Sequence, residues 1–241
     1  PKPKYNLKVG SDNHISQISK IMIRLRKVIL IEKPDWLIVY GDTNTTLAAS
    51  IVGHRENIKI AHIESGLRSY NMQMPEEVNR LITDQLSTLL FCPTKNAIKN
   101  LNKENIKEGV YLVGDTMFDS YIYYKNKKNK SNILRKYNLK KNKYILLTIH
   151  RSHNTDDINR LKNIINCFGN ISNKIDVFFP AHPRTIKILK ENKISVSNIK
   201  INPPVSYKDI LQILNSCKFV ATDSGGLQKE SFFAKKQCFT I

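Results

Sequence analysis

The chain has 241 residues, enough for one large α/β domain or two modest ones with a substantial hydrophobic core. Its formal net charge of +19 would suit nucleic acid, but neither a zinc-finger spacing nor an RNP-like aromatic strand accompanies it, and an acidic small-molecule substrate fits the charge as well. No apolar run approaches the roughly 18 residues of a membrane span and no signal-peptide pattern opens the chain, so we expect a cytoplasmic protein without a membrane partner.

The cysteines are far apart in the sequence, and most of them lie in or beside apolar runs. This spacing favours neither a metal-binding knuckle nor a disulfide framework, so we expect buried, reduced thiols and no metal site. The four cysteines are Cys92, Cys167, Cys217 and Cys238.

Helix and strand patterns alternate through the first half. Apolar residues with helical spacing predict a helix over 15–29, capped by one of residues 11–13. The continuous apolar run 36–40 then predicts a strand buried on both faces, as in parallel sheets. The same patterns predict strands at 58–63, 89–92 and 110–113, with helices at 45–56, 76–87 and 96–104.

The second half repeats this alternation after a lysine-rich stretch, 125–143, which we interpret as a helical connector, although a solvated helix face would have the same composition. Further strands are predicted at 144–149, 177–179, 199–201 and 219–222, with helices at 156–168, 184–191, 207–215 and 227–233.

The predicted fold class is α/β, because repeated strand-helix units with right-handed crossovers build doubly wound parallel sheets. The lysine-rich break predicts two Rossmann-like domains, 1–117 and 118–241, the second with the connector at its start. The chain begins at Pro1 and ends inside the apolar run 238–241, so we expect a fragment in which both domains are truncated. No Gly-x-Gly-x-x-Gly follows any predicted strand, which argues against a dinucleotide cofactor.

Acidic residues follow two predicted strands of the first half and open the next helix. Asp42 follows the strand 36–40, Glu64 follows the strand 58–63, and Glu76 comes directly after Pro75. Carboxylates with separated pKa values on one sheet edge could move protons on a substrate. Ordinary structural roles are also open, because Asp42 could cap a helix and Glu76 suits any helix start.

Glu64 is the most informative of the three acids. It follows a mostly apolar run, so it should be partly desolvated unless a cation answers it. Arg68 and Arg80 could be that cation, in which case Glu64 would be a structural ion-pair partner.

Basic residues and histidines follow two strands of the second half. His150 and Arg151 come after the strand 144–149, and His182 and Arg184 come after the strand 177–179. A single strand-end histidine is commonly a packed loop residue, but two such clusters favour phosphate contacts.

A glycine-rich turn follows the last clear strand, in the segment TDSGGLQKE at 222–230. The backbone N–H groups of Gly225 and Gly226 could close on phosphate oxygens at a helix N-terminus, with the Ser224 hydroxyl beside them. Glu230, one helical turn further on, could accept both hydroxyls of a ribose. These residues predict a nucleoside diphosphate site; the alternative is a tight turn with Ser224 as cap and Glu230 in a surface salt bridge.

The sequence resembles the nonhydrolysing UDP-N-acetylglucosamine 2-epimerases, which have the two-Rossmann-domain glycosyltransferase-B architecture. The matching segments span nearly the whole chain in the family's order. They are GDTN at 41–44, HIESGLR at 62–68, PEEVNR at 75–80, VGD at 113–115, HR at 150–151 and DSGGLQKE at 223–230.

The resemblance implies an active site between the domains, where UDP leaves as the C2 proton is removed, and 2-acetamidoglucal is then reprotonated on the opposite face. It implies a UDP-sugar substrate, no cofactor, a homodimer and no nucleic-acid partner. The implied acid–base carboxylates are Asp42, Glu64 and Glu76; His150 helps the diphosphate leave; Arg151, Ser224, Gly225 and Gly226 bind the diphosphate, and Glu230 binds the ribose.

The sequence departs from the family pattern in places. His153 stands where the family usually has Glu, and the family's N-terminal glycine-rich loop and distal Arg are absent. The alternatives are a 2-epimerase of a modified UDP-sugar such as a UDP-diacetamido-uronate, and the hydrolysing branch that releases N-acetylmannosamine. A basic nucleic-acid-binding protein is a distant third.

Overall fold

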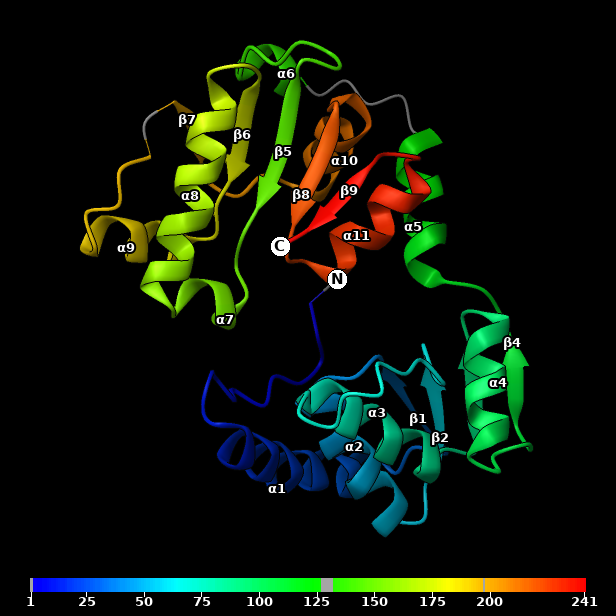
Figure 1. Cartoon of the computed structure of the whole chain (residues 1–241). Coiled ribbons are helices and arrows are strands. Elements are labelled where there is room, and N and C mark those ends of the chain that lie inside the picture. The colour runs from blue at the N-terminus through cyan, green and yellow to red at the C-terminus, as the bar shows by residue number, and fades with distance from the viewer. Residues whose placement is uncertain (1, 127–131, 197) are drawn as a thin grey trace. The chain divides into compact units, whose positions relative to one another are not determined.

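The computed structural model describes residues 2–126, 132–196 and 198–241, which form two compact units (Figure 1). The first unit is Pro1–Thr116 and the second is Met117–Ile241. Each unit is a parallel β-sheet with helices packed against it. Among the described residues, no helix is long and apolar enough to cross a membrane.

The sheet of the first unit has the strand order β1-β2-β3-β4, so every strand follows its neighbour in sequence. Side-chain caps explain where its helices begin, because Asn13, Thr43 and Thr94 each accept a hydrogen bond from a backbone N–H of the first turn. The elements are α1 His14–Glu32, β1 Trp36–Tyr40, α2 Asn44–Arg55, β2 Lys59–Ile63, α3 Pro75–Leu86, β3 Leu89–Cys92, α4 Lys95–Lys103 and β4 Val110–Leu112.

The prediction that the strand 36–40 is buried on both faces was wrong. Val39 is 5% exposed, but Ile38 and Tyr40 on the other face are 58% and 62% exposed. β1 is the edge strand of the described sheet, and α2 packs against it. A continuous apolar run fits a strand with one covered face as well as one with two, so the run alone could not decide.

The second sheet has the order β7-β6-β5-β8-β9, with β5 at its centre. The order reverses between β5 and β8, and such a reversal opens a crevice at the carboxyl ends of the strands. The strands are β5 Tyr144–Thr148, β6 Asp176–Pro180, β7 Ile199–Asn202, β8 Phe219–Thr222 and β9 Cys238–Thr240. The helices are α5 Thr116–Asn126, α6 Ile133–Lys136, α7 Ser152–Thr155, α8 Ile158–Ser172, α9 Pro183–Glu191, α10 Tyr207–Ser216 and α11 Gly225–Phe233.

The lysine-rich stretch 125–143 lies within the second unit. Its residues 127–131 lie outside the described part of the chain, and the described remainder contains the end of α5 and the four-residue α6. The described residues of this stretch therefore form short helical and turn segments, and the boundary between the units falls at the start of α5.

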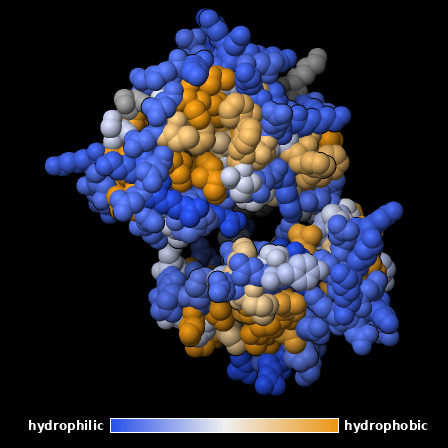
Figure 2. Space-filling view, in the orientation of Figure 1, coloured by the Kyte–Doolittle hydropathy of each residue, from blue (hydrophilic) through white to orange (hydrophobic). Residues whose placement is uncertain are grey.

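The surface of both units is largely hydrophilic, with apolar patches (Figure 2). All four cysteines are free, but only Cys92 and Cys217 are buried as expected; Cys238 is half-buried, and Cys167 is exposed. Cys167 lies two residues after the buried Ile165 on α8, and two residues correspond to about 200° around a helix, so it faces away from the core.

Candidate active site

Two of the predicted carboxylates meet at the carboxyl edge of the first sheet. Asp42 and Glu64 follow β1 and β2, whose last residues, Tyr40 and Ile63, are paired in register. Arg80 of α3 lies between them: its Nη2 is 2.7 Å from Asp42 Oδ2 and 3.9 Å from Glu64 Oε2. The arginine side chain is 10% exposed, whereas the two carboxylates are about one-third exposed. The buried Arg80 guanidinium thus holds both carboxylates, which remain partly accessible to solvent.

The structure also decides between the two roles that the sequence left open for Asp42. Thr43 caps α2 by accepting from the Thr46 N–H, which leaves the Asp42 carboxylate for Arg80. The Asn79 side chain donates to the Asp42 carbonyl at 2.8 Å. Two consecutive residues of α3 therefore hold the Asp42 loop in place.

Glu76 is exposed on the first turn of α3, as its position after Pro75 predicted. It precedes Arg80 by four residues, so both lie on one face of the helix. The next residue, Glu77, is buried and accepts from the N–H groups of Ser69 and Tyr70. Although burial acts to raise the pKa of Glu77, these hydrogen bonds hold it below its ordinary value. Glu77 thus anchors the 69–70 loop, and Glu76 stays open to solvent.

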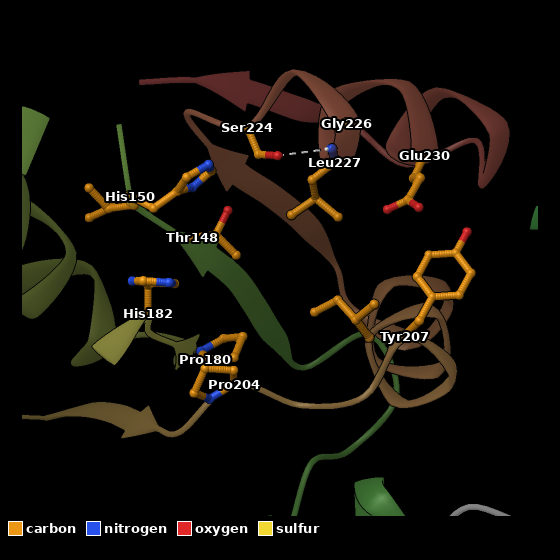
Figure 3. A pocket seen from close by; sticks show the side chains of 12 residues that line it. Thr148, His150, Pro180, His182, Pro204, Tyr207, Ser224, Gly226, Leu227 and Glu230 are labelled. Carbon is orange, nitrogen blue, oxygen red and sulfur yellow. Dashed lines mark hydrogen bonds between the residues drawn. The ribbon is translucent and has the colours of Figure 1, made fainter. Parts of the chain in front are cut away.

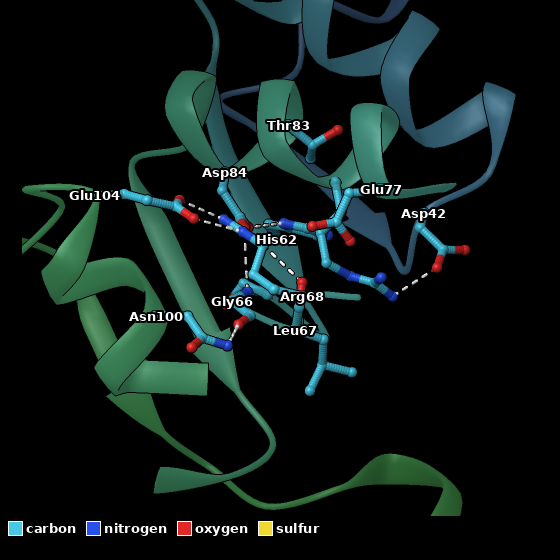
Figure 4. A network of polar contacts seen from close by, with 12 residues as sticks. Asp42, His62, Gly66, Leu67, Arg68, Glu77, Thr83, Asp84, Asn100 and Glu104 are labelled. Atoms are coloured by element: carbon cyan, nitrogen blue, oxygen red, sulfur yellow. Dashed lines mark hydrogen bonds and ion pairs between the residues drawn. The ribbon is translucent and has the colours of Figure 1, made fainter. Parts of the chain in front are cut away.

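Arg68 is not the partner of Glu64, and that part of the prediction was wrong. Its side chain is 1% exposed, with Nη1 2.7 Å from Asp84 Oδ2 and both Nε and Nη2 donating to Glu104 (Figure 4). Burial opposes its charge, but the two carboxylates raise the pKa of Arg68 above its ordinary value. Arg68 therefore belongs to a buried ion cluster, and Arg80 alone of the two arginines answers Glu64.

The second unit has a cavity of about 370 Å³ at the reversal of its strand order (Figure 3). Such crevices are where open α/β sheets bind ligands. Five residues singled out from the sequence line it, namely His150, His182, Ser224, Gly226 and Glu230, together with Thr148, Ile149, Pro180, Pro204, Tyr207, Ile210 and Leu227.

His150 is oriented by Asp223, a residue that the sequence analysis did not single out as functional. Asp223 Oδ1 is 3.0 Å from His150 Nδ1, and its carboxylate also accepts from the N–H groups of His150 and Arg151. Burial acts to raise the pKa of Asp223, but these hydrogen bonds and one from Asn154 hold it well below its usual range. The ionised carboxylate accepts a hydrogen bond from Nδ1–H, so the Nε2 atom of His150 is left for a ligand.

The glycine-rich turn starts α11 beside the same cavity. Ser224 caps the helix by accepting from the Leu227 N–H at 3.3 Å, as the structural alternative predicted. The first N–H groups of a helix have no partner within it and favour anions. A Cβ at Gly225 would lie 3.6 Å from an Arg151 Nη atom, so the guanidinium lies next to this turn. Backbone donors and a cation thus converge there.

Glu230 is 8% exposed and does not form the surface salt bridge that was the alternative. Its carboxylate faces the hydroxyl of Tyr207 at the cavity wall (Figure 3). Burial raises the pKa of Glu230, and the Tyr207 hydrogen bond partly offsets that effect. Tyr207 is the second residue that the sequence reasoning missed. A buried carboxylate at the cavity wall is suited to accept ligand hydroxyls.

The second basic cluster is only partly at the site. His182 lines the cavity and caps α9 through its Nδ1 atom, whereas Arg184 pairs with Asp156 in a half-exposed ion pair. His153 is exposed on α7. Within the described parts of the chain, no three His, Cys, Asp or Glu side chains are grouped as metal ligands.

The geometry defines an α/β protein with two Rossmann-like units, and comparison with solved structures agrees. A crystal structure of Methanocaldococcus jannaschii UDP-GlcNAc 2-epimerase in complex with UDP-GlcNAc and UDP matches the chain with a TM-score of 0.90 and 41% identity, over 100% of this chain and 69% of that one. The predicted fold class, the glycosyltransferase-B type of two-domain α/β protein, is confirmed.

The family model for UDP-N-acetylglucosamine 2-epimerase matches residues 1–241. A Methanococcus maripaludis protein named UDP-N-acetylglucosamine 2-epimerase homolog is 44% identical over 100% of this chain and 69% of its own length. A Pseudomonas aeruginosa UDP-2,3-diacetamido-2,3-dideoxy-D-glucuronate 2-epimerase is 40% identical over 100% of this chain and 68% of its own length. The chain belongs to the UDP-N-acetylglucosamine 2-epimerase family, as its motifs predicted.

Proposed function

We propose that the protein is a nonhydrolysing UDP-N-acetylglucosamine 2-epimerase, an isomerase that interconverts UDP-GlcNAc and UDP-ManNAc. The observation that carries this proposal is the cavity of the second unit, where His150, the Ser224–Gly226 turn and Glu230 surround one space in a chain of this family. Hydrogen-bond donors that can bind an anion lie at one end of the cavity, and the buried Glu230 carboxylate lies at the other. This arrangement suits a nucleoside diphosphate.

The proposed binding roles follow from this polarity. The backbone N–H groups of Gly225 and Gly226, the Ser224 hydroxyl and the Arg151 guanidinium bind the diphosphate. Glu230 accepts hydrogen bonds from the ribose hydroxyls, and the Tyr207 hydroxyl orients its carboxylate for this role. His150, as an imidazolium whose Nδ1–H donates to Asp223, donates from Nε2 to the diphosphate as it leaves.

The proposed reaction is an elimination followed by an addition. A carboxylate removes the C2 proton, the C1–O bond breaks with its electron pair going to UDP, and a C1–C2 double bond forms, giving 2-acetamidoglucal. UDP then adds back to C1 while a proton is delivered to the opposite face of C2. Asp42, Glu64 and Glu76 are the proposed acid–base residues, since efficient proton transfer needs groups poised on the substrate. No net oxidation occurs, so the atoms and electrons balance without a redox partner.

Product analysis tests the proposal. The full-length protein, incubated with UDP-GlcNAc and followed by proton NMR, is expected to produce UDP-ManNAc and to reach the same mixture from either sugar. Release of free N-acetylmannosamine and UDP instead would assign the protein to the hydrolysing branch.

A second candidate substrate is a UDP-2,3-diacetamido-uronate. The support is the 40% identity to the Pseudomonas enzyme, which is close to the 44% identity to the Methanococcus relative. A ratio of kcat/KM values for the two sugars, measured in competition, decides between them. Preference for the uronate would keep the proposed chemistry and replace the proposed substrate.

We further propose that the protein works in the cytoplasm as a homodimer without binding nucleic acid. The four free thiols support a reducing compartment, and the exposed apolar side chains of α1 and β1 support self-association. Light scattering on the full-length protein gives the mass, and a monomer at micromolar concentration would remove the dimer from this account.

A further inference from the structure

The proposed mechanism makes no use of His62, although its side chain is completely buried near the carboxyl end of β2. Its Nδ1 atom is 2.7 Å from Asp84 Oδ1, and its Nε2 atom is 2.8 Å from the Gly41 carbonyl oxygen. Both neighbours are oxygen atoms with lone pairs. A neutral imidazole can donate from only one nitrogen, so it would place a lone pair against one of these oxygens.

Asp84 cannot supply the missing proton. Its Oδ2 atom accepts from Arg68 Nη1 at 2.7 Å and from the Gly66 N–H at 3.1 Å, so the carboxyl is ionised. The Gly41 partner is a backbone carbonyl, which only accepts. Both ring nitrogens of His62 must therefore donate, and the ring is an imidazolium.

The charges of the cluster agree with this assignment (Figure 4). Arg68 and an imidazolium at His62 balance Asp84 and Glu104, whereas a neutral His62 would leave the four groups with one more negative charge than positive. Cys92 and Glu77 are further titratable groups near Arg68: burial raises the pKa of the Cys92 thiol, so it adds no charge, and the Glu77 carboxylate accepts from the N–H groups of Ser69 and Tyr70.

The imidazolium acts on the loop that carries Asp42. The Gly41 N–H donates to the Ile63 carbonyl at 2.9 Å, and His62 donates to the Gly41 carbonyl, so both polar groups of this residue are fixed to β2. Gly41 has a φ of +63°, and a Cβ there would lie 3.3 Å from Glu64 Oε2. The contact with His62 therefore helps to fix the backbone that leads into Asp42, and Gly41 lies close to the Glu64 carboxylate.

We propose that His62 is a positioning residue that is held as an imidazolium and ties the Asp42 loop to the buried Asp84–Arg68–Glu104 cluster. Its effect on catalysis rests on the proposed function; its charge state and its hold on Gly41 do not. Acid–base catalysis requires accurately placed groups, and a displacement of about 1 Å can cost about 10²-fold in rate. A residue that fixes the Asp42 loop should therefore affect kcat.

The first test is ¹⁵N NMR of the full-length protein labelled at histidine, with His62 assigned from the His62→Gln spectrum. At about pH 8, where an ordinary exposed histidine is neutral, both ring nitrogens of His62 are expected to carry protons. A His62 nitrogen without a proton at that pH would overturn the proposal, whatever the protein catalyses.

The second test compares His62→Gln with His54→Gln, a control on the exposed surface of the same unit. His62→Gln is expected to lower kcat by about 10-fold or more with unchanged UDP affinity, and His54→Gln to change neither. A folded His62→Gln variant with the parent kcat would contradict the positioning role. If the parent protein does not epimerise UDP-GlcNAc, the proposed function fails and the NMR result still stands.

Discussion

Each unit contains a histidine whose Nδ1 atom faces a buried carboxylate, and the two pairs differ in what lies on the other side of the ring. His62 is fully buried with Nε2 against a carbonyl oxygen, whereas the His150 side chain is 46% exposed with its ring beside an open cavity. The same pair of side chains therefore serves as a fixed cation in one unit and as a donor to a ligand in the other. Surroundings, more than residue identity, set the role.

The carboxylates of the first unit should give the largest effects. Amide replacement of Asp42, Glu64 or Glu76 keeps the shape of the side chain but cannot take a proton, so kcat should fall by about 10²-fold or more while UDP still binds. Steady-state kinetics measures kcat for each variant, and calorimetry measures its affinity for UDP. Glu108→Gln, on the exposed surface of the same unit, is the control. Near-normal kcat in Glu64→Gln and Glu76→Gln would make these acids structural ion-pair partners.

His150 should come next. Replacement by Ala removes the proposed donor to the leaving diphosphate, and kcat should fall by about 10-fold to 10²-fold. His153→Ala is the matched control, because that histidine is exposed three residues further on and is not proposed to be essential. A large loss in the control together with a nearly intact His150 variant would reverse the two assignments.

Glu230 separates binding from chemistry. It is proposed to contact only the ribose, so Glu230→Ala should weaken UDP binding by about 1.5–3 kcal/mol for each charged hydrogen bond lost, with kcat at saturation little changed. Glu191→Ala, at an exposed ion pair with Lys187, should leave the affinity unchanged. Unaltered UDP affinity in Glu230→Ala would place the ribose elsewhere.

Tyr207 should give the smallest effect, and one that depends on pH. Its hydrogen bond acts to lower the pKa of Glu230, which burial raises. Tyr207→Phe should therefore raise that pKa further, so the carboxylate becomes protonated, and UDP affinity declines, at a higher pH than in the parent protein. Calorimetry across a pH series measures the shift, and identical pH profiles for the two proteins would exclude the coupling.

The sequence predicted most of the fold and the place of the site, because strand and helix periods and strand-end residues are local features. Asp42, Glu64, His150 and the Ser224 turn all lie at strand ends, as their positions after apolar runs predicted. Pairings across long sequence separations were not predictable in the same way. Arg68 pairs with Glu104, 36 residues away, and not with nearby Glu64.

The sequence pattern also could not predict which face of a strand, or which single acidic residue, is buried. The run 36–40 does not reveal that β1 is the edge of the described sheet, and Glu230 has a helical position that suits either a surface ion pair or a buried contact. Asp223 did carry a signal, since an acid directly after the buried run Phe219–Thr222 must find donors. The contact between Tyr207 and Glu230 depends on how α10 and α11 pack, which no local pattern contains.

The central claim is that the first unit moves protons while the second holds UDP, and isotope exchange tests it most directly. The full-length protein is incubated with UDP-GlcNAc in heavy water, and the C2 position of both sugars is read by NMR and mass spectrometry. Deuterium is expected to enter C2 as epimerisation proceeds, and Glu64→Gln is expected to slow this exchange along with turnover. Epimerisation that retains the original C2 hydrogen throughout would contradict the central claim.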